Sequence, residues 1–336
     1  GGHSDSVIDL AWSWKNLLAS ASVDQSVRIW HPSETSELRI LNYNEIVTSV
    51  IFHPIDQDLV LSGCLDGVVR MYDLRIPDRE ESCKPVSEED TKGIVTALTV
   101  SDDGKTLAVG LFEGTCMFFD LDADARKILS GVAMKKVKST RGKNAKGHKI
   151  TGLEYRGLGK KRDFDAELLV STADSRIRRY RVNNFELLCK YRGHANVGYT
   201  KKRAGVDRMP TQIRASMSED LALIASGSED GRLYIWTNSP PPPRFRWFSK
   251  RHVNAQPVII PLSKREKWIG RTLATSTAFY PIRTAKLGVR DRNSLSPASP
   301  MHVPTHRYVV VGLSTGDIMI LRTVVKEPAP ATPSVS

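Results

Sequence analysis

Short apolar runs alternate with tight-turn signals along the chain, and the same unit recurs six times. In each unit an apolar run meets a two-residue turn, and a strand with alternating apolar and polar positions follows. Turns such as Asp66-Gly67 and Asp230-Gly231 suit a tight hairpin, because glycine accepts positive φ without a Cβ clash. The strand ends on a large apolar side chain six positions after the turn begins. The six hairpins are SASVDQSVRIW (20–30), SGCLDGVVRMY (62–72), VGLFEGTCMFF (109–119), STADSRIRRY (171–180), SGSEDGRLYIW (226–236) and VGLSTGDIMIL (311–321).

Another strand-like run lies upstream of the hairpins, for example VTSVIFHP (47–54) and VTALTVS (95–101). One more strand is expected after each closing side chain, which makes four strands per unit. The closing side chains, from Trp30 to Leu321, are 42, 47, 61, 56 and 85 residues apart. A period of about 40–45 residues with four strands per unit is typical of a β-propeller, and the longer intervals must hold insertions. The pattern therefore predicts an all-β propeller with six recognisable four-stranded blades.

One propeller domain is expected over residues 1–325, followed by a disordered tail at 326–336 that is rich in Pro, Ala and Ser. The longer intervals place insertions at about 129–147, 196–211, 238–253 and 282–307. The chain begins with Gly1 and has no initiator methionine, which is typical of a fragment of a longer protein.

At the hairpins the chain resembles the WD-repeat family, in which a loop His, a Ser or Thr, the turn Asp and the closing Trp brace each blade by hydrogen bonds. A hydrolase triad would need one nucleophile in one exposed site, whereas these residues recur at equivalent repeat positions, as bracing requires. A weaker third set contains His148, Ser171, Asp174 and Tyr180. The resemblance implies two full tetrads: His3, Ser20, Asp24 and Trp30, and His194, Ser226, Asp230 and Trp236.

A closer resemblance rests on VKSTRGKNAKGHKITG (137–152), LLVSTADSRIRRYRV (168–182) and IRASMSEDLALIASGSEDGRLYIW (213–236). These segments are similar to the WD-repeat protein forty-four family, also called rabphilin-like, whose animal member is an effector of an endosomal Rab GTPase. The resemblance implies that the protein is an interaction scaffold of membrane trafficking. It also implies a location in the cytoplasm, at the periphery of endosomal membranes, and a nuclear location is the less favoured alternative. It also implies seven blades. The chain lacks the first, so we expect an open ring or a noncanonical closure, and a small GTPase would bind through regions outside this chain.

The net charge of +12 favours an acidic partner, such as an acidic protein surface or an acidic lipid surface. Seven positive charges lie within residues 134–149, where the alternative is a solvated basic loop. The segment Arg244–Arg251 mixes cations with aromatic residues, so a nucleic-acid partner in RNA or ribosome assembly is the alternative function. The candidate partner-binding residues are Lys135, Lys136, Lys138, Arg141, Lys143, Lys149, Arg176 and Arg178.

Motifs for catalysis and metal binding are not found in the sequence. It contains no P-loop, no G-x-S-x-G and no H-E-x-x-H, and its four cysteines never form C-x-x-C. His302 and His306 would suit a metal on a helix, but Pro300 and Pro304 argue against a helix there. We therefore expect no enzymatic activity, no cofactor and no metal site, and no apolar run reaches the length of a membrane-spanning helix.

Overall fold

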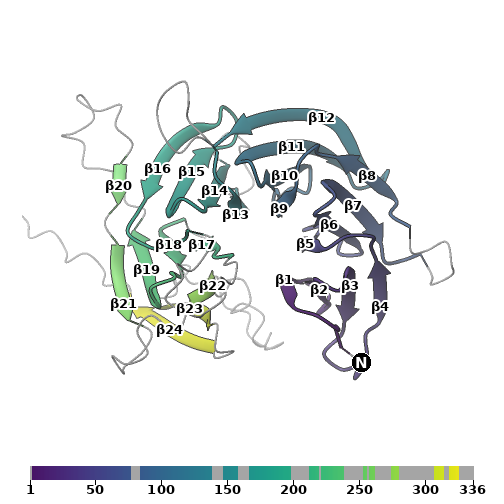
Figure 1. Cartoon of the computed structure of the whole chain (residues 1–336), viewed down its shortest axis with the longest axis horizontal. Coiled ribbons are helices and arrows are strands. Elements are labelled where there is room, and N and C mark those ends of the chain that lie inside the picture. Colours follow the sequence, from purple (N-terminus) through teal and green to yellow (C-terminus); the bar gives the residue numbers. More distant parts are fainter. Residues whose placement is uncertain are drawn as a thin grey trace, which may run out of the picture.

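Six β-sheets stand around a common centre in the computed structural model, and they follow one another in the order of the sequence (Figure 1). The structure describes residues 2–76, 84–137, 147–157, 166–197, 212–218, 221–237, 253–255, 257–261, 274–279, 306–313 and 318–324. Among these residues no helix is long and apolar enough to cross a membrane. The prediction of an all-β propeller with six blades is confirmed.

Three blades follow the predicted order of four strands. Blade 1 contains β1 (Val7–Trp12), β2 (Leu18–Ser22), β3 (Ser26–Trp30) and β4 (Arg39–Asn42). Blade 2 contains β5 (Val47–Phe52), β6 (Leu59–Cys64), β7 (Val68–Asp73) and β8 (Ser87–Asp90). Blade 3 contains β9 (Val95–Val100), β10 (Thr106–Leu111), β11 (Thr115–Asp122) and β12 (Lys127–Lys136). The first eight residues of the range 129–147, predicted to be an insertion, are therefore strand.

The other three blades depart from the simple pattern. Blade 4 contains β13 (Ile150–Arg156), β14 (Glu167–Thr172), β15 (Arg176–Arg181) and β16 (Glu186–Tyr191), and β20 (Val253–Ala255) adds a fifth strand parallel to β16. Blade 5 contains β17 (Ala215–Met217), β18 (Leu223–Ser226), β19 (Arg232–Thr237) and β21 (Pro257–Pro261). In blade 6 the structure describes β22 (Ala274–Phe279), β23 (His306–Leu313) and β24 (Ile318–Val324), so its fourth strand stays a prediction.

The hairpin turns have the backbone that the sequence predicts. Gly67, Gly114 and Gly231 adopt φ of 83°, 79° and 75°. The two copies without glycine, at Gln25 and Ser175, reach φ of 64° and 57° instead. A side chain in this left-handed region is strained, so tertiary contacts hold these two turns in shape.

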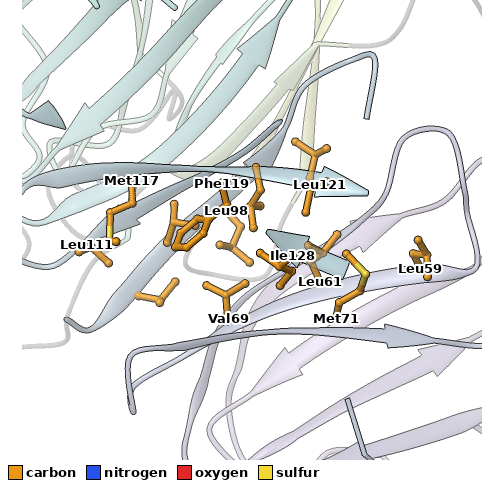
Figure 2. Close-up of a cluster of buried hydrophobic side chains, with 14 residues drawn as sticks. Leu59, Leu61, Val69, Met71, Leu98, Leu111, Met117, Phe119, Leu121 and Ile128 are labelled. Carbon is orange, nitrogen blue, oxygen red and sulfur yellow. The ribbon is translucent and has the colours of Figure 1, made fainter. Parts of the chain in front are cut away.

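Each pair of consecutive blades shares its own cluster of buried hydrophobic side chains, which gives five clusters for six blades. Figure 2 shows the cluster between blades 2 and 3, where Leu61 and Met71 face Phe119 and Ile128. Close approach of the sheets depends on small residues: a Cβ on Gly63 would lie 2.3 Å from Val95 Cγ1. Face-to-face packing of neighbouring sheets is thus the main source of cohesion in this fold.

Blades 1 and 6 lie at the two ends of an open arc (Figure 1). No hydrophobic cluster joins them among the residues that the structure describes. On blade 1, Leu10, Trp12 and Trp14 are 59%, 62% and 62% exposed, whereas Ala11 packs toward blade 2. The described blades thus agree with the expectation of an open ring.

Candidate functional site

Blade 1 forms a complete hydrogen-bonded tetrad. The Nδ1 of His3 donates to Asp24 Oδ2 at 2.8 Å, and the hydroxyl of Ser20 donates to His3 Nε2 at 2.7 Å. The indole Nε1 of Trp30 donates to Ser20 Oγ at 2.8 Å. Although burial alone would raise the pKa of the Asp24 carboxyl, hydrogen bonds from Ser26 and His3 outweigh it and hold that pKa well below its ordinary value. All members are satisfied, so the network rigidifies the blade.

Blade 5 has the same four residue types but does not form the tetrad expected from the sequence. Asp230 accepts a hydrogen bond from the hydroxyl of Tyr234 at 2.6 Å. Trp236 donates to the backbone oxygen of Arg192 at 3.3 Å. His194 is buried, and neither of its ring nitrogens has a hydrogen-bond partner among the described residues. Burial lowers the pKa of His194 to about 4, which keeps the ring neutral at physiological pH.

The third set, in blade 4, also differs from the expectation. His148 is exposed, and Ser171 Oγ accepts a hydrogen bond from the backbone of Ala215 at 3.1 Å. Arg178 takes the place of the histidine: its Nη2 lies 2.6 Å from Asp174 Oδ2, and its side chain is 1% exposed. Arg178 was predicted to bind a partner, but it is buried and paired within its own blade, so it braces the turn.

A common rule links three of the turns. The residue two positions before the closing aromatic side chain donates to the turn aspartate four positions upstream. The three pairs are Arg70 with Asp66 at 2.7 Å, Arg178 with Asp174 at 2.6 Å and Tyr234 with Asp230 at 2.6 Å. For Arg70 and Arg178 the sequence signal was the alternation of arginine with apolar residues, which sequence reasoning did not connect to the turns.

Two of the remaining basic candidates lie in strands of blades 3 and 4. Lys135 is exposed near the end of β12, and Arg176 begins β15 with its side chain 28% exposed and 3.0 Å from Asp174. The backbone N–H of Val137, two residues after Lys135, donates to the oxygen of Gly114 in the hairpin turn of blade 3 at 2.8 Å. Arg176 directly follows the hairpin turn of blade 4 at Ser175. Both residues therefore lie at the end of the ring that carries the hairpin turns. The backbone of Lys136 is placed in β12, whereas Lys138, Arg141 and Lys143 lie outside the described residues.

Lys149 differs from these surface residues because it lies toward the centre of the ring. It is half-buried directly before β13, the strand of blade 4 nearest the centre (Figure 1). Its backbone oxygen accepts a hydrogen bond from Ala173 N at 2.9 Å. Burial, and then repulsion from Arg214, lower the pKa of the Lys149 ammonium.

A polar network that the sequence analysis missed crosses the centre of the ring. Arg214, directly before β17 of blade 5, lies 2.5 Å from Asp9 in β1 of blade 1. Gln212 donates its side-chain amide to the backbone oxygen of Thr96 in blade 3 at 2.8 Å. Ile213 accepts a hydrogen bond from Thr151 of blade 4 at 2.8 Å. Residues 212–214 therefore connect blade 5 with blades 1, 3 and 4. The only sequence signal was an aspartate within the apolar run 7–13.

These repeated blades and the blade 1 tetrad correspond to a known family. The family model described as "WD domain, G-beta repeat" matches residues 1–31, 36–73 and 211–237, which fall in blades 1, 2 and 5. The chain is a WD-repeat β-propeller protein. The crystal structure of the Cps50 (Swd1) β-propeller domain of Myceliophteria thermophila superposes with a TM-score of 0.60, covering 97% of this chain and 85% of that chain at 18% identity. That likeness shows the fold.

Curated relatives share longer stretches of sequence with this WD-repeat protein. It is 36% identical over 236 residues to WD repeat-containing protein 44 of Xenopus laevis, covering 70% of this chain and 23% of the relative. It is 28% identical over 314 residues to the uncharacterized WD repeat-containing protein C18H10.05 of Schizosaccharomyces pombe, covering 91% of this chain and 48% of the relative. The chain thus spans between about a quarter and a half of these two relatives.

WD-repeat propellers are generally non-enzymatic scaffolds for protein interaction. Cys64 is buried, and burial raises the pKa of its thiol to about 12, so the nucleophilic thiolate is suppressed. The described residues contain no group of histidine, cysteine and acidic side chains that could hold a metal.

Proposed function

We propose that this WD-repeat protein is a non-enzymatic interaction scaffold of membrane trafficking, acting in the cytoplasm at the periphery of endosomal membranes. The observation that carries the proposal is the 36% identity with WD repeat-containing protein 44 over 70% of the chain. The same resemblance implies an endosomal role. The proposal extends the general role of WD-repeat propellers, which is to bind other proteins.

The partner-binding surface proposed here is the face between blades 3 and 4 at the hairpin-turn end. Lys135 is exposed there, and Arg176 of the next blade is 28% exposed and lies 3.0 Å from Asp174. Both are held by strands, so their positions are fixed before a partner arrives, and less conformational entropy is lost on binding. A basic surface with mixed Lys and Arg donors favours an acidic protein face.

Affinity capture from cells tests this surface with variants matched in charge. The test variant is Lys135→Glu with Lys136→Glu in β12. The control is Lys105→Glu with Lys127→Glu, which makes the same charge change at the opposite end of blade 3, where both side chains are exposed. We expect the wild type and the control to recover the same endosomal proteins, and the test variant to recover at least fivefold less of them.

Two results would contradict the proposal. Equal recovery by the test variant and the control would remove the face between blades 3 and 4 as the binding surface. Recovery of no endosomal protein by the wild type, with diffuse distribution of the tagged chain in cells, would remove the trafficking role.

A further inference from the structure

Blade 4 carries an added strand at its outer edge. β20 pairs in parallel with β16, the fourth strand of this blade, although β20 lies in the sequence between β19 and β21 of blade 5 (Figure 1). The three residue pairs are Cys189 with Val253, Lys190 with Asn254 and Tyr191 with Ala255. Only Gln256 separates β20 from β21. One short stretch of chain thus covers part of the edge of blade 4 and then forms the outer strand of blade 5.

The outer edge of β16 is suited to strand pairing. β16 has the sequence ELLCKY, which is mostly hydrophobic and contains neither proline nor glycine. The outer strand of blade 2, β8, has the sequence SEED, whose adjacent acidic residues oppose edge-to-edge pairing with another chain. The outer strand of blade 5, β21, begins with Pro257 and ends with Pro261, which have no N–H to donate. β20 therefore covers an edge that has neither protection.

β20 holds this edge weakly. It pairs with three of the six residues of β16, and a strand of three residues is at the short end of those found in proteins. Parallel pairing is also slightly less stable per residue than antiparallel pairing. β16 pairs with β15 on its other side, and β21 pairs with β19 through five residue pairs. β20 can therefore leave without breaking the pairing within either blade.

We propose that the outer edge of β16 is a docking site for an extended segment of a partner protein, which adds to blade 4 as a strand in place of β20. Main-chain hydrogen bonds supply the affinity in this mode of recognition, and β-branched residues favour the extended conformation that it needs. β20 is then an internal competitor, whose tether to β21 keeps its effective concentration at the edge high. That the incoming segment belongs to a protein rests on the proposed scaffold function.

A reversible lock on β20 tests the site in the whole 336-residue chain. Cys189 and Val253 are direct partners in the two strands, at a separation that a disulfide can span. Oxidation of the Val253→Cys variant should therefore join β20 to β16 through Cys189, which peptide mass spectrometry verifies. The probe is a fluorescein-labelled peptide of three Thr-Val repeats with a lysine at each end, and fluorescence anisotropy measures its affinity.

Oxidation of this variant should weaken probe binding about tenfold, because the locked β20 occupies the edge, and reduction should restore the binding. Val253→Cys with Cys189→Ser cannot form the lock, so oxidation should leave its affinity unchanged. Equal affinity of the oxidised and reduced forms of the lockable variant would overturn the proposal. Failure to form the disulfide would remove β20 from this edge and overturn it as well.

Val253→Pro with Asn254→Pro gives an independent test without a disulfide. Two adjacent prolines remove N–H donors on both sides of β20, so its pairing with β16 is weakened in either phase. The freed edge should bind the probe about tenfold more tightly than the wild type does. Ser334→Pro with Val335→Pro adds the same two prolines near the C-terminus and should leave the affinity unchanged. Equal affinity of the wild type and the β20 variant would show that β20 does not compete for the edge.

Two further results identify the occupant. The same peptide with methylated backbone nitrogens at its central Thr and Val should bind about tenfold more weakly, since strand pairing needs those donors; equal binding would overturn strand addition. Sedimentation that shows dimers of the β20 variant, without probe binding, would make a second copy the occupant and overturn the assignment to a partner. These tests use purified protein and synthetic peptides, so their failure is distinct from a failure of the cellular role.

Discussion

Blades 1 and 5 carry the same four residue types at the same repeat positions, yet only blade 1 joins them by hydrogen bonds. In blade 1 both ring nitrogens of His3 are used, one by Asp24 and one by Ser20. In blade 5 the ring of His194 packs edge-on against Trp236, with centroids 5.6 Å apart, and its nitrogens have no hydrogen-bond partner among the described residues. The same motif therefore produces a polar brace in one blade and an apolar contact in the other.

The cause lies two residues before the closing tryptophan. In blade 5 this position is Tyr234, whose hydroxyl takes the turn carboxylate of Asp230. In blade 1 it is Arg28, which pairs with Glu37 at 3.2 Å and leaves Asp24 to the histidine. In these two blades, the turn aspartate thus bonds to the histidine only where the donor of its own strand pairs with another residue.

The largest expected difference between the two blades concerns the closing tryptophans. Trp236 is fully buried among Tyr191, Tyr234 and His194, whereas Trp30 is half-buried. Trp236→Ala should lower the free energy of unfolding by about 3–5 kcal/mol, because it leaves a cavity between blades 4 and 5. Trp30→Ala should cost less, because water can fill the space. Urea unfolding followed by circular dichroism measures both, and equal costs would show that the two blades are braced alike.

Between about pH 7.5 and about pH 4.5, the pH dependence of stability should be a property of blade 5. Burial lowers the pKa of His194 to about 4 in the folded chain, below its ordinary value of 6.5. The unfolded chain therefore binds a proton more readily, so the stability from this group is complete above pH 6.5 and is lost as the pH falls toward 4. From about pH 7.5 to about pH 4.5 the loss should be about 2–3 kcal/mol. His194→Phe should remove this part of the pH dependence in urea titrations. A variant with the slope of the wild type would place the titrating group elsewhere.

Removing the two histidines should have opposite consequences. His3→Ala leaves the buried carboxylate of Asp24 and the hydroxyl of Ser20 with fewer partners, and should cost about 1–3 kcal/mol. His194→Phe replaces two unsatisfied buried nitrogens with carbon and keeps the ring contact with Trp236, so at neutral pH it should be neutral or stabilising. Thermal melts at neutral pH compare the two. A cost for His194→Phe as large as that of His3→Ala would show that blade 5 has a tetrad in solution.

The repeat period and the turn chemistry predicted most of the fold. Asp-Gly and related turns fixed the hairpins, because positive φ is required at their second position, and alternation fixed which strand faces are buried. Alternation did not predict β20, since its three residues, which begin at the end of the predicted insertion 238–253, are too few to carry a periodic signal. The alternation also did not predict that β12 continues through the basic residues 135 and 136. A solvent-facing edge strand and a basic loop can have the same amino-acid composition, so the sequence does not distinguish them.

The candidate site was less accessible from sequence, because it depends on contacts between distant segments. Asp9 and Arg214 are 205 positions apart, and no local pattern connects them. Lys149 was selected for its charge alone, and the same criterion selected Arg178, which is buried beside Asp174. Charge density indicates where cations are numerous, whereas the neighbouring acids decide which cations remain available to a partner.

The smallest expected effects separate the two blades at their hairpin turns. Gly231 of blade 5 adopts φ of 75°, and Gln25 holds the equivalent place in blade 1 with φ of 64°. Gly231→Ala should cost about 1 kcal/mol, because a Cβ strains the left-handed backbone. Gln25→Gly relieves the same strain but makes the unfolded chain more flexible, so its net effect should stay within about 0.5 kcal/mol. Thermal melts of both variants test this asymmetry. A large stabilisation by Gln25→Gly would contradict this expectation. It would mean that the backbone at Gln25 is strained, and that the contacts of the blade 1 tetrad hold it in that conformation.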